Sequence, residues 1–187
     1  SDVGTVRGFG GAGDKPRTRR KDPAPLQHLE LPEDVALHYI TEPTEAPAAV
    51  AALAGAAVVG LDAEWEPDSS SDTPAATVQL ATSVACVVLD LVALATCDGG
   101  LAAADAVVAA ALENAILVGF GLETDLARCR PLLASLDAPE TRELQGTASS
   151  LAALVRGTLG CDLDKRLQRS AWGTMPRPLP DDCVTYA

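Results

Sequence analysis

The sequence predicts an α/β fold with a mixed sheet of five strands flanked by helices. Three short apolar segments at 57–61, 77–81 and 85–91 have the length and composition of strands, and their close spacing suggests an antiparallel meander. After Gly100, segments with helical spacing alternate with further short apolar segments. Strands that come first and then alternate with helices are typical of α/β folds.

Residues 1–30 differ from the rest of the chain in composition. They are rich in glycine, contain the basic run 17–21 and have two prolines shortly after it, without a periodic apolar pattern. We expect a flexible linker or tail here, although the basic run is also compatible with a nuclear signal or a nucleic-acid-binding arm. Residues 31–187 are then a single domain. Because the chain begins at Ser1 rather than at methionine, we also expect it to be a fragment.

The first half of this domain contains a further strand candidate and a helix. Residues 35–40 have the composition of a short strand. Thr44 can act as the N-cap of an Ala-rich helix that has Pro47 in its first turn and ends near Leu53. Residues 57–61 are apolar without alternation, which favours a strand buried on both faces.

The second half of the domain alternates between helix and strand. Apolar residues recur at helical spacing over 101–113, which predicts a helix. Residues 116–119 then form a strand that leads directly into a helix carrying Asp125. The remaining predicted elements are a short strand at 140–144 and helices at 149–156, 163–170 and 181–187.

The charge balance argues against a protein that binds nucleic acid non-specifically along its length. The chain has 14 Lys and Arg against 26 Asp and Glu, for a net charge of −12. Residues 32–125 contain neither Lys nor Arg, so any anion-binding face of the domain is built from the C-terminal third.

Composition also bounds the compartment. No stretch approaches about 18 consecutive strongly apolar residues, and the N-terminus lacks the apolar core of a signal peptide, so we expect neither a membrane span nor secretion. The five cysteines form no CxxC pair, and with only two histidines they give neither zinc-site spacing nor a disulfide framework. We therefore expect reduced thiols in an intracellular protein, whether nuclear, cytoplasmic or organellar.

Asp62 and Glu64 are the first candidate site residues. They directly follow an apolar run, and strand alternation places both on the same face, about 6–7 Å apart along the strand. Two such carboxylates repel each other and are costly to desolvate unless a cation lies between them, and oxygen-only ligands favour Mg²⁺ or Mn²⁺. The alternative is a strand end that frays into solvent, where acidic residues are common.

The other candidates lie further along the chain. Asp125 sits at the start of a helix that follows a glycine-containing turn, where the helix dipole alone also favours an acid. The C-terminal third then supplies four basic residues and two aromatic ones, and phosphate binding and core packing are equally compatible with them. These are Lys165, Arg166, Arg169, Arg177, Trp172 and Tyr186.

Taken together and in this order, these segments resemble the DnaQ-like 3′–5′ exonucleases. The matching runs are VVGLDAEWEP, ILVGFGLETDLARCRPLL and LDKRLQRSAW, the last followed by RPL and TYA. The nearest branch resembles ribonuclease D, Werner-type and mut-seven-type exonucleases, with the mut-seven type the best fit at residues 64–67, 79–82 and 163–165. The resemblance covers residues 31–187.

The resemblance implies a ribonuclease H-like fold and two-metal hydrolysis of phosphodiester bonds at the 3′ end of single-stranded RNA or DNA. Asp62 would bridge two Mg²⁺ or Mn²⁺ ions, Glu64 would hold the ion that activates water, and Asp125 would serve the other. Tyr186 would help to position the attacking water. Lys165, Arg166, Arg169 and Arg177 would hold the substrate backbone.

Three further residues are assigned beside this site. Trp65, next to the acids, either stacks on the terminal base or packs on the sheet. We expect Trp172 mainly to pack in the core and Gln79 to support its own strand.

One departure from the family pattern bears on activity. The family's fourth carboxylate lies four residues after the tyrosine, a position beyond Ala187. We therefore expect the chain as given to bind metal weakly and to be catalytically crippled, and its uninterrupted parent to be active. The alternative is an inactive exonuclease-like module that binds nucleic acid or serves as a scaffold. A small-molecule α/β domain lacks support, because no G-x-G-x-x-G or P-loop pattern follows a strand.

Overall fold

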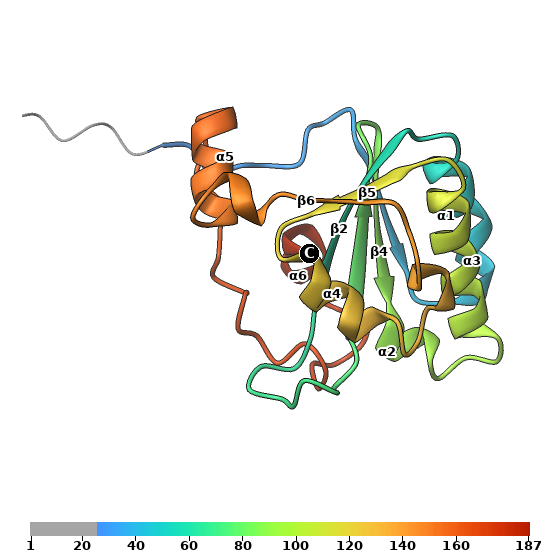
Figure 1. The fold of residues 1–187 in the computed structure, drawn as a ribbon. Coiled ribbons are helices and arrows are strands. Elements are labelled where there is room, and N and C mark those ends of the chain that lie inside the picture. The colour runs from blue at the N-terminus through green and yellow to red at the C-terminus, as the bar shows by residue number, and fades with distance from the viewer. Residues whose placement is uncertain (1–25) are drawn as a thin grey trace, which may run out of the picture.

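A computed structural model describes residues 26–187, and within them a six-stranded mixed sheet runs in the order β1-β4-β3-β2-β5-β6 (Figure 1). β2, β3 and β4 form the predicted antiparallel meander, while β1 pairs in parallel with β4, and β5 and β6 continue in parallel from β2. The strands are β1 (Ala36–Ile40), β2 (Val58–Glu64), β3 (Thr77–Ala81), β4 (Ala85–Asp90), β5 (Ile116–Gly119) and β6 (Thr141–Glu143).

The sheet has one strand more than the five we predicted, because the candidate strand at 35–40 pairs with β4 at the edge of the sheet. Of the predicted linker at 1–30, residues 1–25 lie outside the described part of the chain. The end of that segment is attached to the domain, since the Leu29 amide donates to the Asp162 carbonyl at 2.7 Å and the Asp162 amide donates to the Gln27 carbonyl at 2.9 Å.

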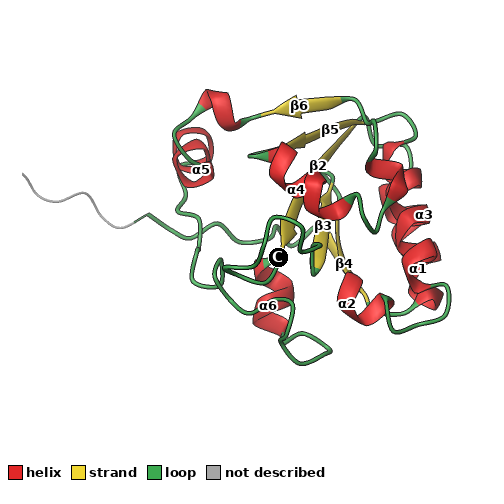
Figure 2. Cartoon of the chain, turned by 60° about the horizontal axis from the view of Figure 1, so that its bottom comes forward, coloured by secondary structure: helices red, strands yellow, loops and turns green. Residues whose placement is uncertain are grey.

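Helices cover the two faces of the sheet unequally (Figures 1 and 2). α1 (Ala46–Leu53) and α3 (Gly100–Leu112) lie together on one face, with the short α2 (Leu91–Leu94) below them in Figure 1. The remaining helices come later in the chain: α4 (Leu122–Cys129) after β5, α5 (Leu151–Leu159) after β6, and α6 (Asp181–Tyr186) at the C-terminal end. Within the described residues, no helix has the length and apolar character needed to span a membrane.

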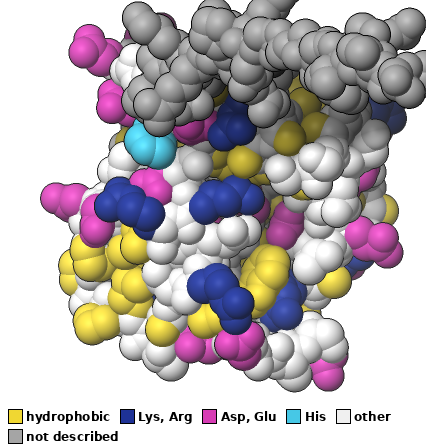
Figure 3. Space-filling model, turned by 90° about the vertical axis from the view of Figure 1, so that its left-hand side faces the viewer, with side chains coloured by type: hydrophobic (Ala, Val, Ile, Leu, Met, Phe, Trp, Pro, Cys, Tyr) yellow, Lys and Arg dark blue, Asp and Glu magenta, His cyan; other side chains and the backbone are white. Residues whose placement is uncertain are grey.

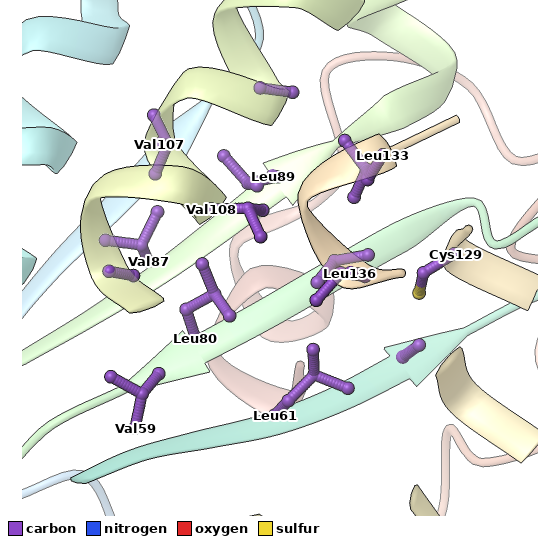
Figure 4. Close-up of a cluster of buried hydrophobic side chains, with 14 of the residues drawn as sticks. Val59, Leu61, Leu80, Val87, Leu89, Val107, Val108, Cys129, Leu133 and Leu136 are labelled. Atoms are coloured by element: carbon purple, nitrogen blue, oxygen red, sulfur yellow. The ribbon is translucent and has the colours of Figure 1, made fainter. Parts of the chain in front are cut away.

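The core on the α1–α3 face is made of apolar side chains that alternate along the strands. Val107 and Val108 of α3 lie over Leu80 of β3 and over Val87 and Leu89 of β4 (Figure 4), and all five are fully buried. Burial of each such side chain stabilises the fold by about 1.5–3 kcal/mol. This first core therefore holds the central strands against the helices.

The opposite face of the sheet is covered by the C-terminal segment of the chain. Ala76 and Val88 on that face form a second core with Trp172, Leu179 and neighbouring residues of α6. The segment 163–180, which leads to α6, forms neither helix nor strand. This second core therefore depends on side-chain contacts rather than on regular structure to hold its covering segment.

The predicted helix over 163–170 is wrong, because the chain there makes only a turn at 166–169. The Asp164 carboxylate accepts the Arg166 amide at 2.9 Å, an arrangement that competes with helix formation. The chain then turns so that the indole of Trp172 becomes fully buried and donates to the Leu167 carbonyl at 3.2 Å.

Smaller differences concern the ends of elements. Thr44 is not a helix N-cap: a 3-10 turn over Pro43–Glu45 precedes α1, and the Glu45 carboxylate accepts the Thr41 amide at 2.7 Å. The predicted strand over 85–91 ends at Asp90, whose carboxylate caps α2. The other predicted elements in the second half of the chain occur with ends shifted by a few residues.

Candidate active site

A cleft of about 690 Å³ opens beside the ends of β2 and α6. Three segments far apart in the sequence line it with the residues that carry the predicted chemistry: Asp62, Glu64 and Trp65 at the end of β2, Asp125 in α4, and Lys165, Arg169 and Tyr186 in the C-terminal segment. The side of the molecule that lies to the left in Figure 1, where α5 is, shows Lys and Arg side chains among Asp and Glu (Figure 3).

Strand alternation directs Asp62 and Glu64 into this cleft. Val59, Leu61 and Ala63 of β2 are buried in the first core, so the residues between them lie on the opposite face of the sheet. Gln79 of the neighbouring strand β3 pairs opposite Asp62; its side chain is buried and donates to the Thr77 hydroxyl of its own strand at 2.8 Å.

Two features place the start of α4, and with it Asp125, against β2. Gly121 adopts a positive φ of 80° at the N-cap of the helix, a conformation that favours glycine. Gly119 lies so close to β2 that a Cβ atom there would be 2.9 Å from the Leu61 carbonyl oxygen. Asp125, in the first turn of the helix, is only 5% exposed.

Glu143 on β6 fixes the same helix end from the other side. Its carboxylate accepts the Gly121 amide at 3.0 Å and the Leu122 amide at 2.8 Å, two of the free amides at the start of α4. The Gln145 amide also donates to this carboxylate at 2.6 Å, and against the opposing effect of desolvation this bond and those from Gly121 and Leu122 lower the pKa of Glu143. Glu143 was missed from the sequence, since its role depends on the pairing of β6 with β5, which no local pattern reveals.

The three acids of the cleft all have raised pKa values. Burial raises the pKa of Glu64 to about 8, with the charges of Asp62 and Asp125 adding to it. Burial also raises the pKa of Asp125 to about 8, with Asp62 and Glu143 adding to it and Arg128 opposing it. Desolvation raises the pKa of Asp62 as well, although part of its side chain opens into the cleft. A cation between these acids would relieve both the desolvation and the repulsion.

The three carboxylates line the same cleft, but they do not converge on a single metal-binding position. Among residues 26–187, no three His, Cys, Asp or Glu side chains are arranged as a ready metal-binding group. The donor set is nevertheless one that suits Mg²⁺ or Mn²⁺, because it consists only of carboxylate oxygens. Asp62, Glu64 and Asp125 are therefore the residues that could hold such ions.

Tyr186 enters the cleft from the last turn of α6. Its ring stacks on Trp172, with centroids 6.0 Å apart and an interplanar angle of 29°. Burial raises the pKa of the Tyr186 phenol, and the charges of Glu64 and Asp62 raise it further, so the hydroxyl keeps its proton at neutral pH and can donate a hydrogen bond. Trp172 itself is fully buried, as predicted for a packing residue.

The predicted phosphate-binding residues separate into two groups. Lys165 and Arg169 line the cleft, and Arg169 forms an exposed ion pair with Asp68 at 2.9 Å. Arg166 pairs with Asp164 at 2.7 Å and does not line the cleft.

The predicted role of Arg177 as a phosphate ligand does not fit its position. Only 14% of its side chain is exposed, and its Nε lies 2.7 Å from Oδ2 of the fully buried Asp90. Arg177 does not line the cleft either. An arginine that is already bound to a buried carboxylate has no free charge to offer a substrate phosphate.

Arg128 is a second residue that the sequence analysis missed. Its guanidinium lies 4.3 Å from the ring centroid of Trp65, and its Nη1 donates to the carbonyls of Ser70 and Thr73 at 3.2 and 2.8 Å. It therefore holds both Trp65 and the polar loop that follows β2. Its position three residues after Asp125, on the same helix face, was the available signal.

Comparison with known proteins shows the family of the chain and its fold. Residues 37–187 match the family model described as 3′–5′ exonuclease. No curated protein sequence matches the chain.

Solved structures show the same fold at low sequence identity. The EXO domain of Aedes aegypti Nibbler is 21% identical, with a TM-score of 0.69 over 86% of this chain and 84% of that one. Escherichia coli RNase D, an exoribonuclease involved in structured RNA processing, is 18% identical, with a TM-score of 0.63 over 81% of this chain and 40% of that one. Trypanosoma brucei RNase D in complex with RNA U12 is 17% identical, with a TM-score of 0.61 over 81% of this chain and 57% of that one. The chain thus spans most of the Nibbler domain but less than two thirds of either RNase D.

Proposed function

Because the chain belongs to the 3′–5′ exonuclease family and shares its fold with ribonuclease D, we propose that it hydrolyses phosphodiester bonds at the 3′ end of single-stranded nucleic acid with two divalent metal ions. The observation that carries the proposal is the shared cleft of Asp62, Glu64, Asp125 and Tyr186. These residues come from three distant segments, and two of the acids have pKa values of about 8.

The acids of the cleft would hold the ions. Asp62 would bind both, while Glu64 and Asp125 would each bind one. Two ions held in this way lower the pKa of an attacking water and stabilise charge on the attacking and leaving oxygens. Because Glu64 and Asp125 hold protons near neutral pH in the metal-free protein, metal binding would release protons from them.

Tyr186 would position the attacking water. Its phenol stays protonated beside Glu64 and Asp62, so its hydroxyl can donate to an oxygen in the cleft. Held by its stacking on Trp172, it would orient the water toward the terminal phosphate. Its contribution would therefore be to geometry rather than to proton transfer.

Trp65, Lys165 and Arg169 would bind the end of the substrate. Trp65 packs against the first core, as one of its two predicted roles requires, and Arg128 lies over its ring. Because it also lines the cleft, its indole would stack on the terminal base. Lys165 and Arg169 are the basic cleft residues for the phosphates, but Asp68 and Asp164 also line the cleft. With so few phosphate contacts, the salt dependence of binding to a single strand should be shallow, with a log–log slope of roughly −0.7 per contact.

RNA is the first substrate to test, because the structural neighbours include an exoribonuclease and an RNase D bound to RNA. A single-stranded RNA labelled at its 5′ end should be shortened stepwise from its 3′ end in the presence of Mn²⁺. Asp62→Asn should abolish the shortening. An equivalent DNA strand and an RNA with a blocked 3′ end are the matched substrates.

The second candidate function is an inactive exonuclease-like module that binds nucleic acid or serves as a scaffold. One observation favours it: in the described residues the three carboxylates do not already form a metal-binding group. It predicts RNA binding that neither depends on Mn²⁺ nor leads to cleavage. Mn²⁺ binding should therefore be measured beside cleavage. If the wild-type chain neither shortens RNA nor binds Mn²⁺, the exonuclease proposal is refuted.

A further inference from the structure

We propose that a buried network of Tyr39, Asp90 and Arg177 is a positioning device for the reaction, which holds Tyr186 at the cleft through Trp172. The proposal rests on the proposed function, in which Tyr186 orients the attacking water. It concerns residues on the second face of the sheet that do not line the cleft themselves. The network gives the C-terminal segment a fixed place that its irregular backbone cannot supply.

Asp90 is the centre of the network. It is fully buried at the end of β4, and four hydrogen-bonding interactions with three partners satisfy its carboxylate. Nε of Arg177 lies 2.7 Å from Oδ2 and 2.9 Å from Oδ1. The Tyr39 hydroxyl donates to Oδ2 at 2.6 Å, and the Ala93 amide donates to Oδ1 at 3.0 Å. Because β1 and β4 are paired strands, the sheet fixes both Tyr39 and Asp90.

From this centre the network reaches the C-terminal segment at three points. Arg177 donates from Nη2 to the Trp172 carbonyl at 2.7 Å and from Nη1 to the Met175 carbonyl at 2.5 Å. The Tyr39 hydroxyl accepts the Leu179 amide at 2.9 Å. The planar guanidinium, with its donors in a fixed fork, makes all of the arginine contacts at once, which the compact ammonium of a lysine cannot.

Trp172 transmits this placement to the cleft. Its main chain is held by Arg177, its indole is fully buried, and its ring stacks on Tyr186. Tyr186 in turn lines the cleft with Asp62 and Glu64. Since Arg177 is turned away from the cleft, a loss of activity on its substitution would not come from a lost phosphate contact.

An ordinary structural role for the pair makes different predictions from a positioning role. An ordinary structural role predicts only that substitution lowers stability, and substitution of any core residue does so. A buried ion pair is in itself weak evidence that the pair stabilises the fold. A positioning role additionally requires that the environment of Trp172 changes, and that the kinetic loss depends on the Tyr186 hydroxyl. Both requirements can be measured.

The first measurement follows Trp172 directly in the metal-free protein. The chain has two tryptophans, so Trp65→Phe leaves Trp172 as the only one. In that background, Arg177→Lys should shift the emission of Trp172 to longer wavelength and increase its quenching by acrylamide. Val107→Ala, which alters the first core on the other face of the sheet, should leave both unchanged.

The second measurement is kinetic and uses the chain with both tryptophans. Arg177→Lys should lower kcat for 3′-end shortening of RNA by about 10–100-fold, the range typical of lost partners of site residues, with KM unchanged. In the Tyr186→Phe background, Arg177→Lys should lower kcat no further. If Arg177→Lys does not fold, Tyr39→Phe serves in both measurements, because it keeps the ion pair and removes only the phenol hydrogen bonds.

The outcomes separate the two proposals. If the wild-type chain shortens RNA but the effects of Arg177→Lys and Tyr186→Phe multiply, or if the Trp172 emission is unchanged, the positioning role is overturned. A wild-type chain that neither shortens RNA nor binds Mn²⁺ contradicts the proposed function instead. The emission measurement then decides whether the network places Trp172, and an unchanged spectrum overturns that placement.

Discussion

On one face of the sheet, two helices bury apolar side chains in regular alternation, whereas on the other face an irregular segment is held by a buried ion pair. The first core is distributed over many side chains, so no single residue there defines the position of a functional group. The second core depends on Asp90, Arg177 and Trp172, and it carries Tyr186 into the cleft. The comparison suggests that the first face supplies stability and the second supplies placement.

The largest effect is expected from Arg177→Met on the second face. It leaves the fully buried Asp90 without its cation, and removal of one partner from a buried pair costs about 3–5 kcal/mol of folding free energy. Urea unfolding at neutral pH measures this loss. A cost below about 1 kcal/mol, typical of an exposed pair, would contradict the description of this face.

Leu89→Ala on the first face should cost about 2–5 kcal/mol, because Leu89 is fully buried and its truncation leaves a cavity. Unlike a substitution at Arg177, it should leave the emission of Trp172 unchanged in the folded protein. The same unfolding titration, followed by tryptophan fluorescence in the Trp65→Phe background so that only Trp172 emits, gives both quantities. A shifted emission maximum in folded Leu89→Ala would show that the two faces are not independent.

The acids of the cleft make the stability of the fold depend on pH. Glu64 and Asp125 have pKa values of about 8 in the folded protein, above their values when unfolded, so the folded state holds more protons between about pH 4 and 8. The stability they contribute is complete below the unfolded pKa and is lost as pH rises to about 8.

Thermal unfolding of the metal-free protein should therefore occur at lower temperature as pH rises through this range. Each pKa unit of difference is worth about 1.4 kcal/mol. Glu64→Gln should flatten the profile, with Glu113→Gln, which lies outside the cleft, as the control. A profile that Glu64→Gln leaves unaltered would contradict the raised pKa of Glu64.

The smallest effect is expected from Glu143→Ala, which removes the cap of α4 at a cost of about 1 kcal/mol. Although this cost in stability is small, Glu143→Ala should clearly weaken Mn²⁺ binding, because it loosens the end of α4 that carries Asp125. Glu140→Ala is the control, since Glu140 pairs only with the exposed Arg142. Equal Mn²⁺ affinities for the two variants would remove Glu143 from the account of the site.

The first face and the acids of the cleft were predictable because their signals are local. The apolar run at 57–61 was expected to be buried on both faces, but that is wrong, because Val58 is 50% exposed while Val59 is buried. Strand alternation nevertheless places Asp62 and Glu64 together. Asp125 was found because a strand, a glycine-containing turn and a helix follow one another directly. In each case the residues that decide the structure are close together in the sequence.

The second face was not predictable in the same way. Arg177 reads locally as a basic residue in a polar segment, and its partner Asp90 lies 87 positions earlier in the chain. The helix expected over 163–170 is lost because Asp164 caps a turn and Trp172 is drawn into the second core. Glu143 and Arg128 likewise act on partners brought near by tertiary structure.

Titration of the metal-free chain with Mn²⁺, followed by the electron paramagnetic resonance of the free ion, tests the metal-binding role of the cleft acids most directly. The account predicts that the wild-type chain binds Mn²⁺ and that Asp62→Asn weakens this binding by more than about 10–100-fold, the range for lost outer partners of a metal site. Asp98→Asn, at an exposed acid outside the cleft, should bind as the wild type does. Equal Mn²⁺ affinities for the wild type and Asp62→Asn would contradict it.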